Sequence, residues 1–146
     1  MLEWQGFCSK SPEMGRILVI DDESSVREAL LWALKADDHE VTLAADGLEG
    51  IRKYKAEASD LVITDLFMPV QDGVKTIIEL RKIDPQVRIL AVSGNALSET
   101  VLPIALRLGA IAVLQKPWEI KQLHEAVNRL LNREKSAVIS QEVTKP

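Results

Sequence analysis

Short apolar runs alternate along the chain with longer segments in which apolar residues recur at helical spacing. The runs are four or five residues long and rich in β-branched residues, which predicts strands. The segments between them place apolar residues three and four positions apart, which predicts amphipathic helices. We therefore expect five strands, each followed by a helix. The predicted strands are Arg16–Ile20, Glu40–Ala44, Asp60–Thr64, Arg88–Val92 and Ala112–Gln115.

Two of the predicted helices begin with residues at capping-box spacing. Ser25 stands three residues before Glu28, and Asp46 stands three residues before Glu49. In each pair the first side chain can accept a bond from the backbone of the second residue. We expect both pairs to cap their helices.

The fourth helix has a proline near its beginning. Proline is tolerated in the first turn of a helix and disrupts its interior. Because of Pro103, we expect this helix to begin near Val101 or Leu102 and Gly94 to Thr100 to form a loop.

The regular order of strand and helix, together with strands that are apolar on both faces, favours a parallel sheet covered by helices on both sides. We predict an α/β fold, a flavodoxin-like doubly wound (βα)5 sheet with strand order 2-1-3-4-5. Residues 15–134 would form this one domain. Residues 1–14 and 135–146 lack periodicity and are predicted to be tails.

Composition narrows the class of protein further. The chain has 146 residues, of which 47% are hydrophobic and 27% charged, as expected for one globular domain. A net charge of −4 and a pI near 5.3 argue against a nucleic-acid surface. Cys8 is the single cysteine, and neither a membrane span nor a signal peptide is evident. We expect a cytoplasmic protein without nucleic-acid or membrane partners.

Polar residues follow four of the predicted strands. Ligands of open parallel sheets bind beyond the carboxyl ends of the strands, near the point where the strand order reverses. Under the predicted order, these polar side chains would meet in one cleft. They are Asp21, Asp22, Asp65, Ser93 and Lys116.

This set of side chains favours phosphoryl transfer. Clustered carboxylates repel one another, so either one is protonated or a cation is present. An open site made of oxygen ligands suits Mg²⁺, which often shares its shell with a phosphate. Lys116 adds a positive group that faces an anion, and carboxylates can form acyl phosphates. Asp65 is therefore the predicted nucleophile.

Four segments, each at the end of its own strand, resemble the receiver (phosphoacceptor) domain of two-component response regulators. The resemblance covers roughly residues 15–134. The segments are VIDDESS, TDLFMPVQDG, VSGNA and LQKPW.

The resemblance implies a role for each matching residue. Asp65 matches the phosphoacceptor and Asp22 a direct magnesium ligand. Asp21 matches the residue that acts mainly through metal-bound water. The backbone carbonyl of Phe67 would complete the protein's share of the metal shell.

Two further roles follow from the same resemblance. Ser93 matches the hydroxyl that moves toward the phosphoryl group. Lys116 matches the lysine that bridges the phosphoacceptor or its phosphate, and the bond between Lys116 and Pro117 matches a cis peptide. No organic cofactor is implied.

The implied function is phosphorelay signal transduction rather than enzymatic turnover. The domain would accept a phosphoryl group from a sensor histidine kinase or phosphotransfer protein and change the face formed by its fourth helix, fifth strand and fifth helix. The sequence does not identify the downstream partner. The resemblance also implies that phosphorylation can lead to a dimer.

Three positions qualify the resemblance. Many receivers carry an aromatic residue three positions before the lysine, where this chain has Val113, so an aromatic rotamer switch is not supported. Phe67 and Asn95 occupy variable positions beside the phosphate that tune dephosphorylation in this family.

Three other classes of protein share parts of this pattern. A phosphatase of the haloacid dehalogenase type needs a second acid two residues after its nucleophile, where this chain has Phe67, and its nucleophile follows the first strand. A flavin-binding module needs a Gly- and hydroxyl-rich phosphate loop, whereas DDESS would repel a phosphate. A receiver-like binding module that works without phosphorylation stays open.

The remaining histidines and aromatic residues carry weaker expectations. His39 and His124 are predicted to be exposed, and Trp118 to fill the core at the start of the last helix. Trp4 and Phe7 in the N-terminal tail could dock on the domain, but disorder is the favoured prediction.

Overall fold

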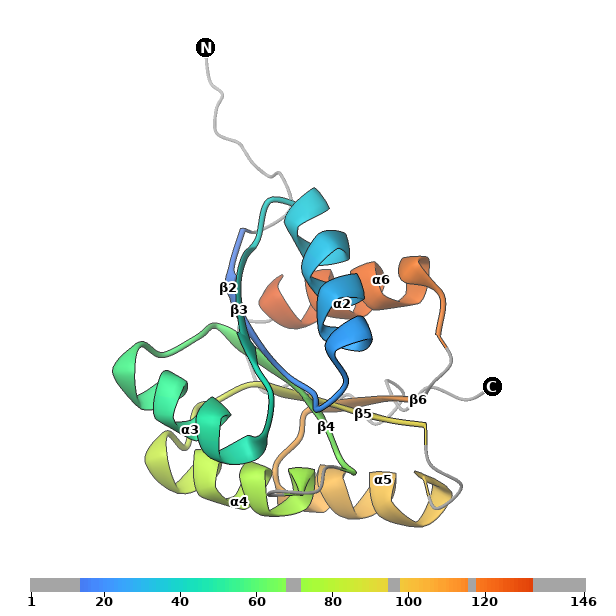
Figure 1. Ribbon diagram of the computed structural model, residues 1–146. Helices are drawn as coiled ribbons and strands as arrows, with labels where there is room; N and C mark the ends of the chain where they lie inside the picture. Colours follow the sequence, from blue (N-terminus) through green and yellow to red (C-terminus); the bar gives the residue numbers. More distant parts are fainter. Residues whose placement is uncertain (1–13, 68–71, 95–97, 116–117, 133–146) are drawn as a thin grey trace.

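One parallel sheet of five strands organises the protein (Figure 1). The computed structural model describes residues 14–67, 72–94, 98–115 and 118–132. The strand order is β3-β2-β4-β5-β6, which in chain order is 2-1-3-4-5, so the predicted fold class is confirmed. The strands are β2 (Arg16–Ile20), β3 (Glu40–Ala44), β4 (Leu61–Asp65), β5 (Ile89–Ser93) and β6 (Ala112–Gln115).

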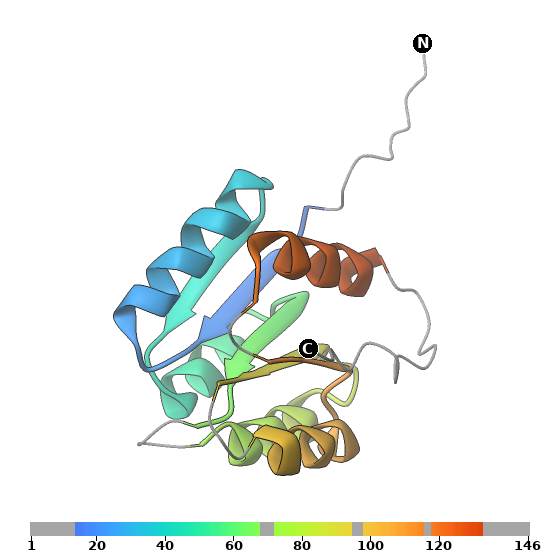
Figure 2. The same cartoon turned by 90° about the vertical axis from the view of Figure 1, so that its right-hand side faces the viewer.

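Helices cover both faces of the sheet (Figures 1 and 2). α3, α4 and α5 pack on one face, and α2 and α6 pack on the other, each group burying its own apolar cluster. Within the described residues, no helix is both long and apolar enough to cross a membrane. The helices are α2 (Ser24–Ala36), α3 (Gly47–Ala56), α4 (Gly73–Ile83), α5 (Ser98–Leu108) and α6 (Ile120–Asn132).

The alternation of side chains along β2 explains why the sheet needs both layers. Leu18 and Ile20 belong to the cluster under α3, α4 and α5, whereas Ile17 and Val19 belong to the cluster under α2 and α6. All four are at most 1% exposed. Burial on both faces keeps the carboxyl ends of the central strands in a rigid frame.

β4 and β5 each begin and end one residue later than predicted. Asp65 pairs with Val92 and Ser93 pairs with Gln115, so the ladder continues through both polar residues. The Leu66 N–H donates to the carbonyl of Val92 at 3.0 Å, which holds the chain beyond β4 against β5. Asp65 and Ser93 are consequently the last residues of their strands rather than the first residues of loops.

The predicted caps had different outcomes. α2 begins at Ser24 with Glu23 as its N-cap and no side-chain cap bond, so the expected box of Ser25 and Glu28 is wrong. The Glu23 N–H instead donates to Asp21 Oδ1 at 2.9 Å, and the Arg27 N–H donates to the Glu23 carbonyl at 3.0 Å, so the N-cap lies two residues before the predicted one.

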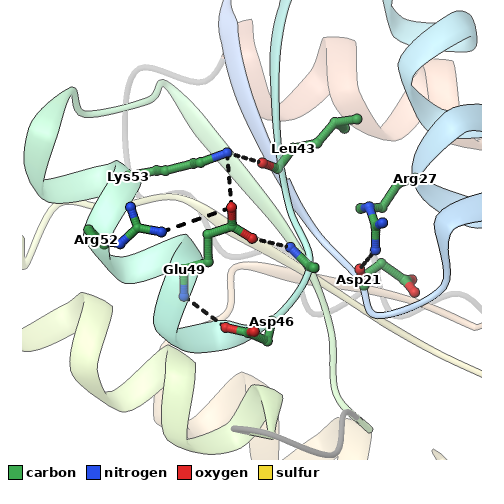
Figure 3. Close-up of polar contacts among 8 residues, drawn as sticks. Asp21, Arg27, Leu43, Asp46, Glu49, Arg52 and Lys53 are labelled. Carbon is green, nitrogen blue, oxygen red and sulfur yellow. Dashed lines mark hydrogen bonds and ion pairs between the residues drawn. The ribbon is translucent and has the colours of Figure 1, made fainter.

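The second predicted cap is confirmed at α3 (Figure 3). Asp46 Oδ1 accepts from the Glu49 N–H at 2.8 Å, and Glu49 Oε1 accepts from the Ala45 N–H at 2.7 Å. The bond from Ala45 is the largest cause of a lowered pKa of Glu49. Lys53 adds an ion pair at 3.3 Å from Glu49 Oε2.

The predicted start of the fourth helix is wrong. α5 begins at Ser98 and contains Pro103 as its sixth residue. A proline there has a φ that suits a helix, but it lacks the N–H that would bond to Glu99 four residues earlier and its ring crowds that carbonyl. The helix therefore loses one bond close to its beginning and does not start later.

The prediction for the histidines is wrong for His39, which is 4% exposed. Its Nδ1 accepts the Gly15 N–H at 3.1 Å, joining the turn between α2 and β3 to the start of β2. Burial is the main cause of a lowered pKa of His39. His124 on α6 is partly buried, and its Nδ1 lies 2.5 Å from Asp37 Oδ2 at the end of α2.

Candidate functional site

Three carboxylates converge where β2 and β4 end. The two strands are parallel neighbours, so their carboxyl ends meet at the same edge of the sheet. Side-chain oxygens of Asp21, Asp22 and Asp65 all lie within 4.8 Å of one another. Asp21 is 3% and Asp65 is 7% exposed, whereas Asp22 is exposed. The structure therefore brings together the three acids that were predicted from the sequence to meet.

The loop after β2 is held by three hydrogen bonds, of which Figure 3 draws the one between Arg27 and Asp21. The Asp21 N–H donates to the Ala44 carbonyl of β3 at 3.1 Å, which extends the pairing of the strands by one residue. Asp21 Oδ1 accepts the Glu23 N–H. The Arg27 guanidinium donates to the Asp21 carbonyl at 2.7 Å. These bonds bind the start of α2 back onto the loop and so place the acid pair.

Asp65 is positioned by bonds to the residues on either side of it. The Thr64 hydroxyl donates to the Asp65 carbonyl at 3.0 Å, and the Phe67 N–H approaches Asp65 Oδ1 at 3.4 Å. The carboxylate thus interacts with the backbone of Phe67, whose carbonyl is the predicted fourth metal contact.

Gly73 is a positioning residue that was not among the predicted site residues. An added Cβ would collide with the Asp65 carbonyl oxygen and lie 2.6 Å from the Cα of Leu66. The Gly73 N–H donates to the Leu66 carbonyl at 3.0 Å. Asp72 caps α4 by accepting the Lys75 N–H at 2.8 Å. The signal in the sequence was a glycine at the start of the helix that comes after the Asp65 strand.

The hydroxyl candidate lies on the neighbouring strand. Ser93 ends β5, which pairs with β4, and it is fully buried. Val113 in β6 is 1% exposed and pairs with Ala91, so an aliphatic side chain fills the position where many receivers have an aromatic ring.

Lys116, Pro117 and Asn95 lie outside the described residues. β6 ends at Gln115, directly before Lys116, and Gln115 pairs with Ser93 at the same edge of the sheet as Asp65.

The donor set fits a hard divalent cation. All three side chains offer carboxylate oxygens, two of them from enclosed residues, and oxygen ligands are what Mg²⁺ prefers. The nearby Arg27 donates to the backbone carbonyl of Asp21 and not to its carboxylate. Within the described part of the chain, no second group of three His, Cys, Asp or Glu side chains is placed to share an ion.

Comparison with known proteins identifies the class to which this fold and site belong. The model of the response regulator receiver domain family matches residues 17–128, and the chain belongs to this family. Family membership places the protein in two-component, phosphorelay signalling.

Two curated relatives differ in length. The chain is 34% identical over 118 residues to the chemotaxis protein CheY of Bacillus subtilis, covering 80% of this chain and 98% of that protein. It is 33% identical over 129 residues to the transcriptional regulatory protein PrrA of Mycobacterium tuberculosis, covering 88% of this chain and 55% of PrrA. The chain thus spans nearly all of CheY and about half of PrrA.

Solved structures agree with this assignment. A response regulator receiver domain protein from Clostridium thermocellum has a TM-score of 0.76 and 33% identity, covering 82% of this chain and 96% of that chain. The receiver domain of NtrX from Brucella abortus has a TM-score of 0.76 and 28% identity, covering 81% and 99%.

Proposed function

We propose that this receiver domain accepts a phosphoryl group on Asp65 in a Mg²⁺-dependent reaction. The observation that carries the proposal is the convergence of three carboxylates within 4.8 Å, with Asp65 enclosed at the end of a buried central strand. Three like charges so close are costly without a counter-ion. An anionic phosphodonor reaches Asp65 only when that charge is offset.

The proposed reaction is a direct transfer. A carboxylate oxygen of Asp65 forms the new O–P bond while the bond from phosphorus to the donor breaks, and the leaving group keeps the electron pair. With a phosphohistidine donor the broken bond is P–N, and the products are an acyl phosphate and histidine. Bound Mg²⁺ would neutralise charge on the phosphoryl oxygens.

The other candidate residues have supporting roles in this proposal. Asp22 binds the ion directly, Asp21 holds it mainly through water, and the Phe67 carbonyl adds a neutral ligand. The Ser93 hydroxyl and the Lys116 ammonium contact the phosphoryl oxygens once these are on Asp65. Burial of Ser93 at the end of the adjacent strand supports this assignment.

We further propose that residues 15–134 act as one signalling domain with residues 1–14 and 135–146 as tails. The donor would be a sensor histidine kinase or phosphotransfer protein, and a surface on the domain would carry the signal to a downstream protein. Turnover as an aspartyl-nucleophile phosphatase is disfavoured because Phe67 stands where the second acid would be needed. We also propose that the protein is cytoplasmic and that phosphorylation leads to a dimer.

Intact-mass spectrometry after incubation with acetyl phosphate and Mg²⁺ tests the proposal. We expect the wild type to gain one phosphate, which hydroxylamine removes because it cleaves acyl phosphates. Asp65→Asn should remain unlabelled. Asp38→Asn is the matched control, because Asp38 is exposed and has a φ of 68°, a conformation that asparagine tolerates.

Two outcomes would overturn the assignment. Labelling that survives Asp65→Asn would show that another residue accepts the phosphoryl group. Equal labelling in excess chelator would show that the reaction does not need the metal. A wild type that never gains a phosphate would instead support a binding module that works without phosphorylation.

A further inference from the structure

An apolar groove lies between α2 and α6, on the face of the sheet opposite α3, α4 and α5. It has a volume of about 360 Å³, and its lining is almost wholly apolar. Ile120 on its rim is 53% exposed, and Ala29 is exposed as well. Leaving such a surface in water is unfavourable, so the groove has the character of a binding site. It is lined by Ser25, Val26, Ala29, Leu30, Trp118, Ile120 and Leu123.

An exposed apolar stripe leads from this groove along α2 to the place where the N-terminal segment enters the domain. Ala29, Trp32 and Ala36 are exposed and share one face of the helix, and Trp32 is 69% exposed. Beyond the end of α2, His39 accepts the Gly15 N–H. Figure 1 shows the chain entering β2 beside this end of α2. The entry of the chain, the stripe and the groove are therefore connected along one helix.

The chemistry of the N-terminal segment matches this surface. The whole chain has six aromatic residues, counting three Trp, two Phe and one Tyr, and two of them are Trp4 and Phe7. Segments that stay solvated are typically poor in aromatic residues. Two aromatic side chains close together can fill an apolar groove that a polar tail cannot.

The distances allow the contact. The part of α2 between Ser25 and Ala36 is about 16 Å long at 1.5 Å per residue. Phe7 lies seven positions before Met14, which is about 23 Å of extended chain. Phe7 can therefore reach the groove. Trp4 can reach past the end of the groove that lies nearer to Met14.

We propose that the N-terminal segment carrying Trp4 and Phe7 runs along the exposed face of α2 and docks these aromatic side chains in the groove between α2 and α6. The groove begins at Ser25, close in sequence to Asp22. The docking itself does not depend on phosphorylation.

Cys8 provides a direct test, because it is the single cysteine of the chain and lies next to Phe7. A nitroxide spin label on Cys8 of the full chain should broaden the amide signals of Val26, Ile120 and Leu123. The amides of Thr76 and Ile77 on α4, across the sheet, should stay sharp. Reduction of the nitroxide supplies the reference spectrum.

Matched variants make the test specific. Trp4→Ala with Phe7→Ala should abolish the broadening in the groove, whereas Gln5→Ala with Ser9→Ala should retain it. Ile120→Ser should weaken it, and Ile83→Ser, at a 39% exposed position on α4, should not. Ile120 and Ile83 are both exposed, so the fold should be retained in these two variants.

Three results would overturn the proposal. Broadening confined to the amides around Gly15 would mean that the segment does not follow α2. Broadening that is unchanged by the Trp4 and Phe7 substitutions would mean that other residues are responsible. Broadening of an isotope-labelled chain without a spin label by a second, spin-labelled chain would assign the groove to another copy of the protein. All three are read without phosphodonor, so a failure of Asp65 labelling leaves this test unaffected.

Discussion

Gly73 in the first turn of α4 lies directly against the Asp65 carbonyl, at a distance that leaves no room for a Cβ. The N–H of Gly73 also bonds to the Leu66 carbonyl at 3.0 Å. The end of β4 and the start of α4 are thus in backbone contact. The position of the proposed phosphoacceptor depends on this contact.

Gly73→Ala should therefore destabilise the protein, although alanine usually favours a helix by up to about 1 kcal/mol over glycine. Forcing a methyl group against rigid backbone typically costs about 1–3 kcal/mol. We expect a lower urea midpoint and weaker Mg²⁺ binding, because Asp65 must shift. Gly15→Ala is the control: its Cβ would lie 2.9 Å from Leu131 Cδ2, a side-chain atom near the start of β2 and so at the opposite end of the sheet from Asp65, and Mg²⁺ affinity should be unchanged. Unaltered stability and metal binding in Gly73→Ala would contradict the proposed contact.

Asp22→Asn should have opposite effects with and without metal. In chelator, removing one of three clustered charges should raise the free energy of unfolding. With Mg²⁺ at about 100 times its Kd, the free energy of unfolding of the wild type should rise by about 2.7 kcal/mol. That of the variant should rise clearly less at the same Mg²⁺ concentration. Urea unfolding in both conditions measures this, with Glu28→Gln on the exposed side of α2 as control. The same Mg²⁺-induced gain in Asp22→Asn and wild type would exclude Asp22 as a ligand.

Lys116→Met should weaken phosphorylation, or the response to it, without weakening Mg²⁺ binding. Removing a positive charge near the acids should leave Mg²⁺ affinity intact or slightly higher, because the cation no longer competes with the ion. Phosphorylation by acetyl phosphate, or the response to it, should weaken. Isothermal titration and intact mass measure the two properties, with Lys121→Met on the exposed side of α6 as control. Wild-type labelling and wild-type response in the variant would refute the role of Lys116.

Beryllofluoride with Mg²⁺ should perturb amide signals from Ser93 to Leu106. A phosphate mimic on Asp65 offers acceptor oxygens that a hydroxyl and backbone N–H groups can meet, so the chain after β5 should close toward it. Because Val113 is buried and aliphatic, we expect no change in its packing comparable to an aromatic rotamer switch. Ser93→Ala should reduce the perturbation in α5. Shifts confined to Asp21 and Asp22, with Ser93 to Leu106 silent, would show that this face is not the output.

His39 should make stability fall in mild acid. Burial lowers its pKa in the folded protein, so the unfolded chain binds the proton more readily. The contribution is fully present above the unfolded pKa near 6.5 and is lost as the pH falls from there through the lower folded pKa. Asp37 and Asp38 oppose this shift, and His124 on α6 reinforces it. Protonation of Nδ1 would also break the bond from Gly15.

The measurement is the difference in unfolding free energy between wild type and His39→Gln as a function of pH. That difference should shrink below about pH 6.5, because the variant lacks the titrating group. In a His124→Gln background the fall in stability should remain but be smaller, because His124 no longer reinforces the lowered pKa of His39. A difference independent of pH between about 5 and 8 would contradict the proposed linkage.

Most of the fold and the members of the acid cluster could be predicted from the sequence. The bounds of β2, β3 and β6 follow from short apolar runs, and the strand order follows from the βα alternation. Asp21, Asp22 and Asp65 were identified because the residues at the carboxyl ends of neighbouring parallel strands meet at one edge of the sheet. These features repeat over many residues or obey a rule of topology, so local errors do not change them.

Tertiary contacts decided what local patterns could not. Ser25 and Glu28 have the spacing of a capping box. The Glu23 N–H nevertheless donates to Asp21 Oδ1, and the helix starts earlier. His39 is polar, yet its burial follows from its bond to Gly15, a residue 24 positions away in the chain. The need for glycine at position 73 comes from the Asp65 carbonyl, and the groove exists only because α2 and α6 lie on the same face of the sheet. In each case the deciding partner is distant in sequence or competes with a local one, and only the folded chain brings the two together.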